Sequence, residues 1–458
     1  MRDDTAPALK RDLGVWSAAA IVLGTMIGSG IFLVPRDMIQ SVGSPPWLFA
    51  AWIAGGLLSL CGALTYAELA TAMPEAGGEY VYLRAAYGPL WGFLYGWTQM
   101  WVAKSGSIAA MATGFFYYLA DFRPELERVL YTVRLPIGPR GGPLEIRYGQ
   151  ILAIAIILAL GLVNYLGVRF GGRLQVGVTA LKLGLIGGII VIGLGGGQGS
   201  AAHLVATIPA AGGLGGFFAA LVGALWAYDG WNNVSMVSSE IRDPRRSLPR
   251  ALVAGTAAVI GIYVLANLAY FYVLSPAEVA ATPRVASAMI SRILGAGWGS
   301  AASIAVMISI FAALNGSLLS GARVPYAMAR DRLFFAPLAR VHPAYGTPGV
   351  SILALAGWSA VLVLSGRFED LYRYVMFASW IVYGMTGLGV ILLRRRRPDL
   401  ERPCRVAGYP WLPILFVAGA AAVTGSTLLK YPRESLLGLG IIFAGLPFYS
   451  YWRRRFSR

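Results

Sequence analysis

The sequence predicts an all-α membrane protein of 12 transmembrane helices. Of its 458 residues, 57% are hydrophobic and only 13% are charged, and the mean hydropathy is +0.64. Soluble domains carry about twice that charged fraction. Apolar windows of roughly 20 residues, the length of a helix that crosses a bilayer, recur along nearly the whole chain. The composition therefore leaves no room for a separate soluble domain.

Twelve segments fit this length, and the basic residues orient them. The segments that would face the cytoplasm carry 23 Lys and Arg residues, and the outer loops carry 12. This bias follows the positive-inside rule, so the net charge of +17 reflects topology rather than a nucleic-acid partner. We expect a multi-pass protein of the inner or plasma membrane with cytoplasmic termini and no cleavable signal peptide. The spans lie near 14–41, 46–72, 87–120, 150–169, 173–195, 214–240, 249–274, 297–329, 348–366, 370–393, 409–428 and 434–452.

The first segment contains an interruption. The run GTMIGSGIFLVP (24–35) places Gly28-Ser29-Gly30 near its middle and a proline shortly afterwards. Each glycine costs about 1 kcal/mol of helix propensity relative to alanine. Close helix packing is the alternative, because Gly24 and Gly28 form a GxxxG spacing. Three consecutive small residues and a matching second interruption favour an unwound helix.

The second interruption, Asp229-Gly230, lies within LWAYDGWNN of the sixth segment. Matching interruptions in two halves of a chain point to a transporter binding site. The two breaks are five segments apart, and an odd number of spans inverts the second half relative to the first. We therefore predict an N-terminal cytoplasmic segment 1–13, a first repeat 14–195, an inverted second repeat 196–393, and two further spans with the C-terminus in 394–458.

Broken helices have a direct chemical use. Non-helical backbone within a membrane survives only where it lines a cavity or is buried in protein. Free N–H groups at the start of a half-helix suit a carboxylate, and free carbonyls at the end of another suit an ammonium group. Two facing breaks therefore predict a receptor for a zwitterion, above all an α-amino acid.

Several motifs resemble the amino acid–polyamine–organocation (APC) superfamily. They are GTMIGSGIF in the first segment, YAELATAMPEAGGEYVYL after the second, and NGSLLSGAR in the eighth. The runs WNNVSMVSSEIRDPRRSLPRA and RRRRPDLERPCRVAGYPWLPI are similar to its L-type amino acid transporter (LAT) branch. The resemblance covers about residues 12–455 and implies the leucine-transporter (LeuT) fold, a 5+5 inverted repeat with helices 1 and 6 broken. Arginine outnumbers lysine 34 to 4, which favours a bacterial homologue.

The resemblance also implies a substrate site. Residues 28–30 would hold the substrate carboxylate, residues 26–27 and Ala227 would contact its amino group, and Trp226 would close over it as a gate. Asn232 would help shape the site. The substrate-binding residues expected in this way are Met26, Ile27, Gly28, Ser29, Gly30, Ile31, Trp226, Ala227, Asp229, Gly230 and Asn232.

Asp229 departs from the large-neutral members of the branch, which have glycine there. The run WAYDGWN is instead close to that of the heteromeric exchanger for cystine, dibasic and neutral amino acids. A carboxylate in a low-dielectric pocket would attract cationic substrates. Alternatively, Asp229 caps a half-helix and leaves selectivity unchanged.

Lys182, within VTALKLGLIGG of the fifth segment, matches a lysine of this branch. In sodium-coupled relatives a cation site lies near this place, between spans 1 and 8. An ammonium group there could replace sodium, which would imply sodium independence. Alternatively it could release a proton during transport or snorkel to an interface.

Three other polar residues are candidates for a supporting shell. Lys104 would contact the substrate or form a structural pair, and Asn315 would bond between helices near the site. Glu240 would form a cytoplasmic gate network with the charged residues of 242–246, or lie in a solvated loop.

The sequence favours a transporter that works alone. The outer loop 121–149 has no cysteine, so the disulfide-linked ancillary subunit of eukaryotic relatives is not expected. Two cysteines and two loop histidines predict neither a disulfide framework nor a metal or cofactor site. We predict an antiporter, a sodium-independent, alternating-access exchanger of neutral and cationic L-amino acids. The alternatives are a proton-coupled symporter or a polyamine carrier; an enzyme would need catalytic groups that no span centre carries.

Overall fold

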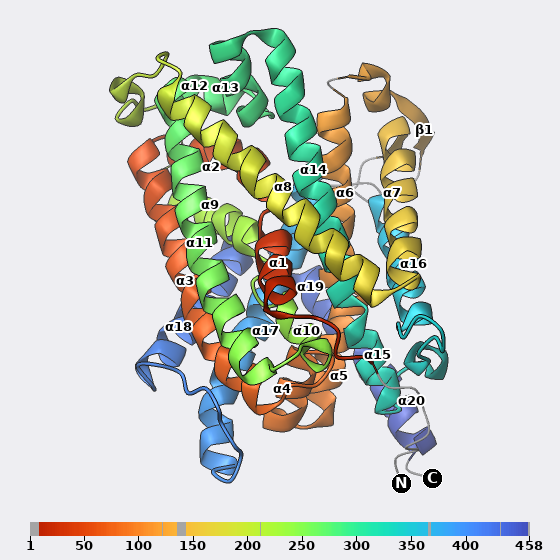
Figure 1. Ribbon diagram of the computed structural model, residues 1–458. Coiled ribbons are helices and arrows are strands. Elements are labelled where there is room, and N and C mark those ends of the chain that lie inside the picture. Colours follow the sequence, from red (N-terminus) through yellow and green to blue (C-terminus); the bar gives the residue numbers. More distant parts are fainter. Residues whose placement is uncertain are drawn as a thin grey trace.

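The computed structural model describes residues 9–120, 122–134, 143–210, 212–364, 368–430 and 432–456. Parts of the predicted segment 1–13 and outer loop 121–149 lie outside these ranges. The described chain forms a bundle of helices (Figure 1). Its first elements are α1 (Val15–Met26), α2 (Gly30–Val42), α3 (Pro45–Ala72), α4 (Glu79–Tyr87), α5 (Pro89–Thr98), the π-helical turn η1 (Gln99–Ala103), α6 (Lys104–Leu119), η2 (Pro124–Glu127), β1 (Val129–Val133), β2 (Leu144–Arg147), α7 (Tyr148–Tyr165) and α8 (Val168–Gly195). The later elements are η4 (Ala201–Leu204), α9 (Gly213–Tyr228), α10 (Asn233–Met236), η5 (Ser238–Glu240), α11 (Pro244–Val273), α12 (Pro276–Ala281), α13 (Val285–Leu294), α14 (Ala296–Gly321), α15 (Arg323–Arg330), η6 (Ala336–Ala339), α16 (Gly349–Val363), α17 (Phe368–Arg396), α18 (Trp411–Lys430), α19 (Pro432–Phe443) and α20 (Gly445–Phe456).

Most of the predicted spans are long apolar helices. Within the described residues, nine helical segments are long and apolar enough to cross a membrane. The predicted spans 87–120, 214–240 and 348–366 are not among them. The first is divided by η1, the second stops at Tyr228, and the third contains the 15-residue α16. A π-helical turn therefore divides the first of these helices, and the predicted interruption ends the second.

One part of the fold is not helical. β1 and β2 pair as an antiparallel two-stranded sheet, with Val129 opposite Arg147. The prediction of an all-α chain was wrong at this point. The strand sequence VLYTV is rich in β-branched residues, which favour strands, but it is too short to stand out beside the long apolar segments of the sequence.

Both predicted interruptions are breaks between helices at the centre of the bundle. Residues 27–29 separate α1 from α2, and residues 229–232 separate α9 from α10. α1 packs against α8, α11 and α14, while α2 lies along α9. α12 and α13 lie at one end of the molecule, and α4, α10 and α15 lie toward the other (Figure 1). The breaks are therefore deep inside the protein.

The two breaks are tied directly to each other. Thr25 Oγ1, at the end of α1, lies 2.9 Å from the Gly230 carbonyl oxygen and 2.7 Å from that of Ile21, so these two acceptors share one hydroxyl proton. Tyr263 Oη on α11 lies 2.7 Å from the Met26 carbonyl oxygen and 2.8 Å from that of Ala227. These contacts satisfy backbone groups that helical bonding leaves free, as a lipid environment demands.

A buried ion pair lies close to α10. The Arg323 guanidinium makes two bonds to the Glu240 carboxylate, of 2.7 and 2.9 Å, and both side chains are at most 1% exposed. The prediction that Glu240 pairs with charged residues of 242–246 was wrong, because its partner is Arg323. Arg242 instead lies 3.7 Å from Asp12, and the exposed Arg245 pairs with Glu401.

We expect Glu240→Ala to destabilise the protein severely, because it leaves Arg323 buried without its counter-charge. Removing one partner of a buried pair costs about 3–5 kcal/mol. Glu401→Ala is the matched control, because an exposed pair such as Arg245–Glu401 contributes about 0–1 kcal/mol. Thermal unfolding in detergent should show a large fall in Tm for Glu240→Ala alone. Equal shifts in the two variants would contradict this account of the pair.

Candidate functional site

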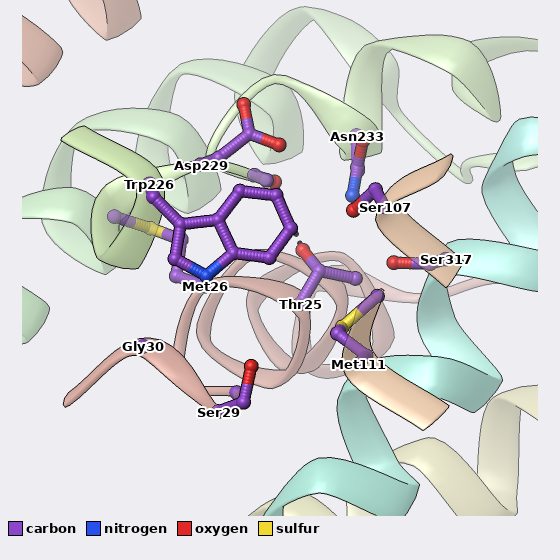
Figure 2. Close-up of a pocket in the computed structure, with 12 residues that line it drawn as sticks. Thr25, Met26, Ser29, Gly30, Ser107, Met111, Trp226, Asp229, Asn233 and Ser317 are labelled. Carbon is purple, nitrogen blue, oxygen red and sulfur yellow. Dashed lines mark hydrogen bonds between the residues drawn. The ribbon is translucent and has the colours of Figure 1, made fainter. Parts of the chain in front are cut away.

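A pocket lies between the two helix breaks, with α6 and α14 completing its wall (Figure 2). It brings together seven of the predicted substrate residues from spans that are 200 residues apart in sequence. The complete lining is Thr25, Met26, Gly28, Ser29, Gly30, Ser107, Met111, Trp226, Asp229, Gly230, Asn233 and Ser317. The pocket therefore lies where both chain halves present irregular backbone.

The first break presents hydrogen-bond donors to the pocket. The first N–H groups of α2, which begins at Gly30, have no preceding helical carbonyl to bind and carry the positive end of the helix dipole. Ser29 Oγ is buried and has no hydrogen-bond partner among the described residues. A buried hydroxyl without a partner is costly, so a ligand carboxylate would satisfy it.

The carbonyls of the breaks are largely engaged within the protein. The Met26 carbonyl accepts bonds from the Gly28 N–H at 2.8 Å and from Tyr263 Oη. The Ile27 carbonyl accepts from Lys182 Nζ at 2.5 Å and Ser309 Oγ at 3.1 Å. Each carbonyl has two lone pairs, so the Ile27 carbonyl has no free capacity for a substrate amino group in this conformation. The Met26 carbonyl shares the single Tyr263 hydroxyl proton with the Ala227 carbonyl.

The second break contributes an aromatic wall and a carboxylate. Figure 2 shows the Trp226 ring lying over the end of α1, beside Thr25 and Met26. The Asp229 carboxylate lies at the edge of the pocket, directed away from Ser29. Tyr383 Oη on α17 donates to Asp229 Oδ1 at 2.7 Å.

Four predicted substrate residues lie behind the lining. Ile31 is fully buried, and Ile27 and Ala227 offer carbonyls to side chains of other helices. Asn232 turns to Glu79, to which its amide nitrogen donates. The neighbouring Asn233 lines the pocket in its place.

Five lining residues were missing from the prediction. They are Thr25, Ser107, Met111, Asn233 and Ser317. Ser317 follows the predicted Asn315 by two residues on α14, whereas Asn315 bonds to Asn164 and Gln175 on neighbouring helices at 2.9 Å. Polar residues near the motifs were the available signal, but the sequence does not fix which of them face inward.

Lys182 is fully buried on α8 and reaches the first break. Its Nζ lies 2.7 Å from the Gly24 carbonyl oxygen, 2.5 Å from that of Ile27, and 3.4 Å from that of Ser309. The ammonium group thus joins α1, α8 and α14. Three carbonyl oxygens around one positive charge resemble the oxygen cage that a small cation would need.

The model of the amino acid permease family matches residues 13–434. The chain belongs to this family. The permease is 34% identical to the serine/threonine exchanger SteT of Bacillus subtilis over 98% of both chains. It is 32% identical to the mouse b(0,+)-type amino acid transporter 1 over 98% of this chain and 91% of the relative. The mouse Asc-type amino acid transporter 1 is also 32% identical, over 98% of this chain and 83% of the relative.

These relatives confirm the resemblance to the APC superfamily and its L-type branch, with a bacterial exchanger among them. The permease is therefore a multi-pass membrane protein of an amino acid transporter family, and its relatives are transporters rather than enzymes.

Substitution of Gly30 tests whether the breaks must touch. A Cβ at Gly30 would lie 2.6 Å from Ala227 Cα, a backbone contact that cannot be relieved by a rotamer change. We expect Gly30→Ala to lower amino acid uptake at least tenfold, because it forces the two breaks apart. Gly261→Ala on α11 is the control, since no atom lies within 4 Å of its added Cβ. Equal uptake by both variants would show that the contact is dispensable.

Proposed function

We propose that the permease is a sodium-independent, alternating-access exchanger of neutral and cationic L-amino acids. The observation that carries this proposal is the pocket between two helix breaks, with the Ser29 hydroxyl and the first N–H groups of α2 on one side and Asp229 on the other. An α-carboxylate would take the N–H groups and the free Ser29 hydroxyl. A cationic side chain would approach Asp229.

We further propose twelve transmembrane helices in the LeuT arrangement. The first repeat would be 14–195, the inverted second repeat 196–393, and the last two spans would lie in 394–458. Its support is the pair of breaks five predicted spans apart, together with three interrupted or short helices that complete the count. Both termini would be cytoplasmic, and the permease would act without a disulfide-linked subunit, since 121–149 has no cysteine.

Lys182 supports sodium independence. Its ammonium group is surrounded by carbonyl oxygens of α1 and α14, so a bound sodium ion would have to displace it. Exchange is also the activity printed in the name of the Bacillus relative, a serine/threonine exchanger. A proton-coupled symporter is the second candidate, with Lys182 releasing a proton during transport. A polyamine carrier that uses Asp229 for an amine is the third.

Counterflow in proteoliposomes tests exchange. We expect labelled leucine and arginine to enter vesicles loaded with unlabelled amino acid, in sodium-free buffer and without a proton gradient. Empty vesicles should take up at most a tenth as much. Uptake into empty vesicles that follows an imposed proton gradient would contradict exchange and support the proton-coupled symporter. A requirement for sodium would contradict the proposal that Lys182 takes the place of a sodium ion.

Asp229→Asn tests the cationic substrates. The amide keeps the size of the side chain and can still accept a bond from Tyr383, but it carries no charge. We expect arginine counterflow to fall at least tenfold while leucine counterflow stays within threefold of the wild type. Exposed Asp399→Asn serves as the charge-removal control. Parallel losses for both substrates would mean that Asp229 only supports the fold.

A further inference from the structure

A second buried lysine lies beside the pocket and has a different environment from Lys182. Lys104 is the first residue of α6, directly after the π-helical turn η1, and is only 6% exposed. Its Nζ donates to Asn233 Oδ1 at 2.6 Å. Asn233 and Ser107, which lies one turn beyond Lys104, both line the pocket. π-Helical turns are frequent at functional sites. This turn places the Lys104 ammonium group behind the pocket wall, in contact with the lining residue Asn233.

Two carboxylates lie within electrostatic range of this ammonium group. Lys104 interacts electrostatically with Asp229 and Glu79. Glu79 is fully buried and accepts bonds from Tyr95 Oη at 3.0 Å and from Asn232. The cluster therefore holds two carboxylates and one ammonium group, and one of the carboxylates is the proposed anchor for cationic substrates.

We propose that Lys104 is a specificity-determining residue that acts as an internal counter-cation of Asp229. The inference rests on the proposed substrate site. The positive charge of Lys104 partly offsets the electrostatic attraction of the Asp229 carboxylate for a substrate ammonium or guanidinium group. Lys104 also repels such a group directly, because the two charges have the same sign and the site has a low dielectric constant. A neutral side chain avoids this repulsion. Lys104 thereby lowers the preference for cationic over neutral amino acids.

Lys104 also positions a pocket residue. An ammonium group only donates, so it holds the oxygen end of the Asn233 amide. The nitrogen end is then left toward Ser107, as drawn in Figure 2. This fixed amide presents a donor rather than an acceptor to the pocket, which again disfavours a cationic ligand group.

Arginine and its neutral isostere citrulline have similar shapes but differ in charge, so a comparison of the two isolates the effect of substrate charge. The readout is the ratio of their apparent affinities, measured by inhibition of labelled leucine counterflow in proteoliposomes. We expect Lys104→Gln, which keeps a donor for Asn233, to shift the ratio toward arginine at least tenfold. Lys104→Arg keeps the charge and should stay within threefold of the wild type. In an Asp229→Asn background, Lys104→Gln should again shift the ratio toward arginine at least tenfold, because the repulsion between Lys104 and a cationic substrate does not require Asp229.

An unchanged ratio in Lys104→Gln, in either background, would overturn the inference. If the Lys104 variants do not fold, Asp229→Asn alone decides: the unopposed Lys104 should make arginine bind at least tenfold more weakly than citrulline, and equal binding would overturn the inference. Absence of any leucine counterflow by the wild type would instead refute the proposed function.

Discussion

The contact between the two helix breaks is the constraint on which the rest of the structure depends. Each break frees backbone groups that lipid cannot satisfy, and the protein satisfies them largely by placing the breaks against each other. The Thr25 hydroxyl lies within hydrogen-bond distance of the Gly230 carbonyl, and the Tyr263 hydroxyl lies within hydrogen-bond distance of one carbonyl at each break. Gly30 allows the backbones to approach so closely that a methyl group would not fit. The pocket is the space left beside this contact.

The break on α1 also explains why a lysine can be buried in α8. A charged group in a membrane interior needs strong polar partners, and Lys182 finds the carbonyls of Gly24 and Ile27 where the helix ends. Either group alone would be costly: the carbonyls would lack donors, and the ammonium group would lack acceptors. The break and the lysine therefore stabilise each other. The Ile27 carbonyl, which also accepts from Ser309, cannot then serve a substrate amino group.

The sequence was sufficient to predict what depends on local composition. The Gly-Ser-Gly run and the charged residue between tryptophans each mark a place where a continuous helix is costly, and the structure has a helix break at both. A lysine among apolar neighbours marks a place that needs polar partners, and Lys182 has backbone carbonyls there. The direction in which each side chain points was harder to predict. Asn232 and Asn233 are adjacent and chemically identical, yet only Asn233 lines the pocket. The partner of Glu240 lies 83 residues away, so nearer arginines misled the prediction.

The two buried lysines show why burial alone does not assign a role. Lys182 is surrounded by carbonyl dipoles, whose charge does not change with the substrate, so its contacts depend on how α1, α8 and α14 are packed. Lys104 bonds to an amide of the pocket wall and lies within electrostatic range of two ionisable carboxylates. Its electrostatic energy therefore changes whenever a charge enters beside Asp229. The chemistry of the partners, rather than depth in the membrane, links one lysine to architecture and the other to substrate charge.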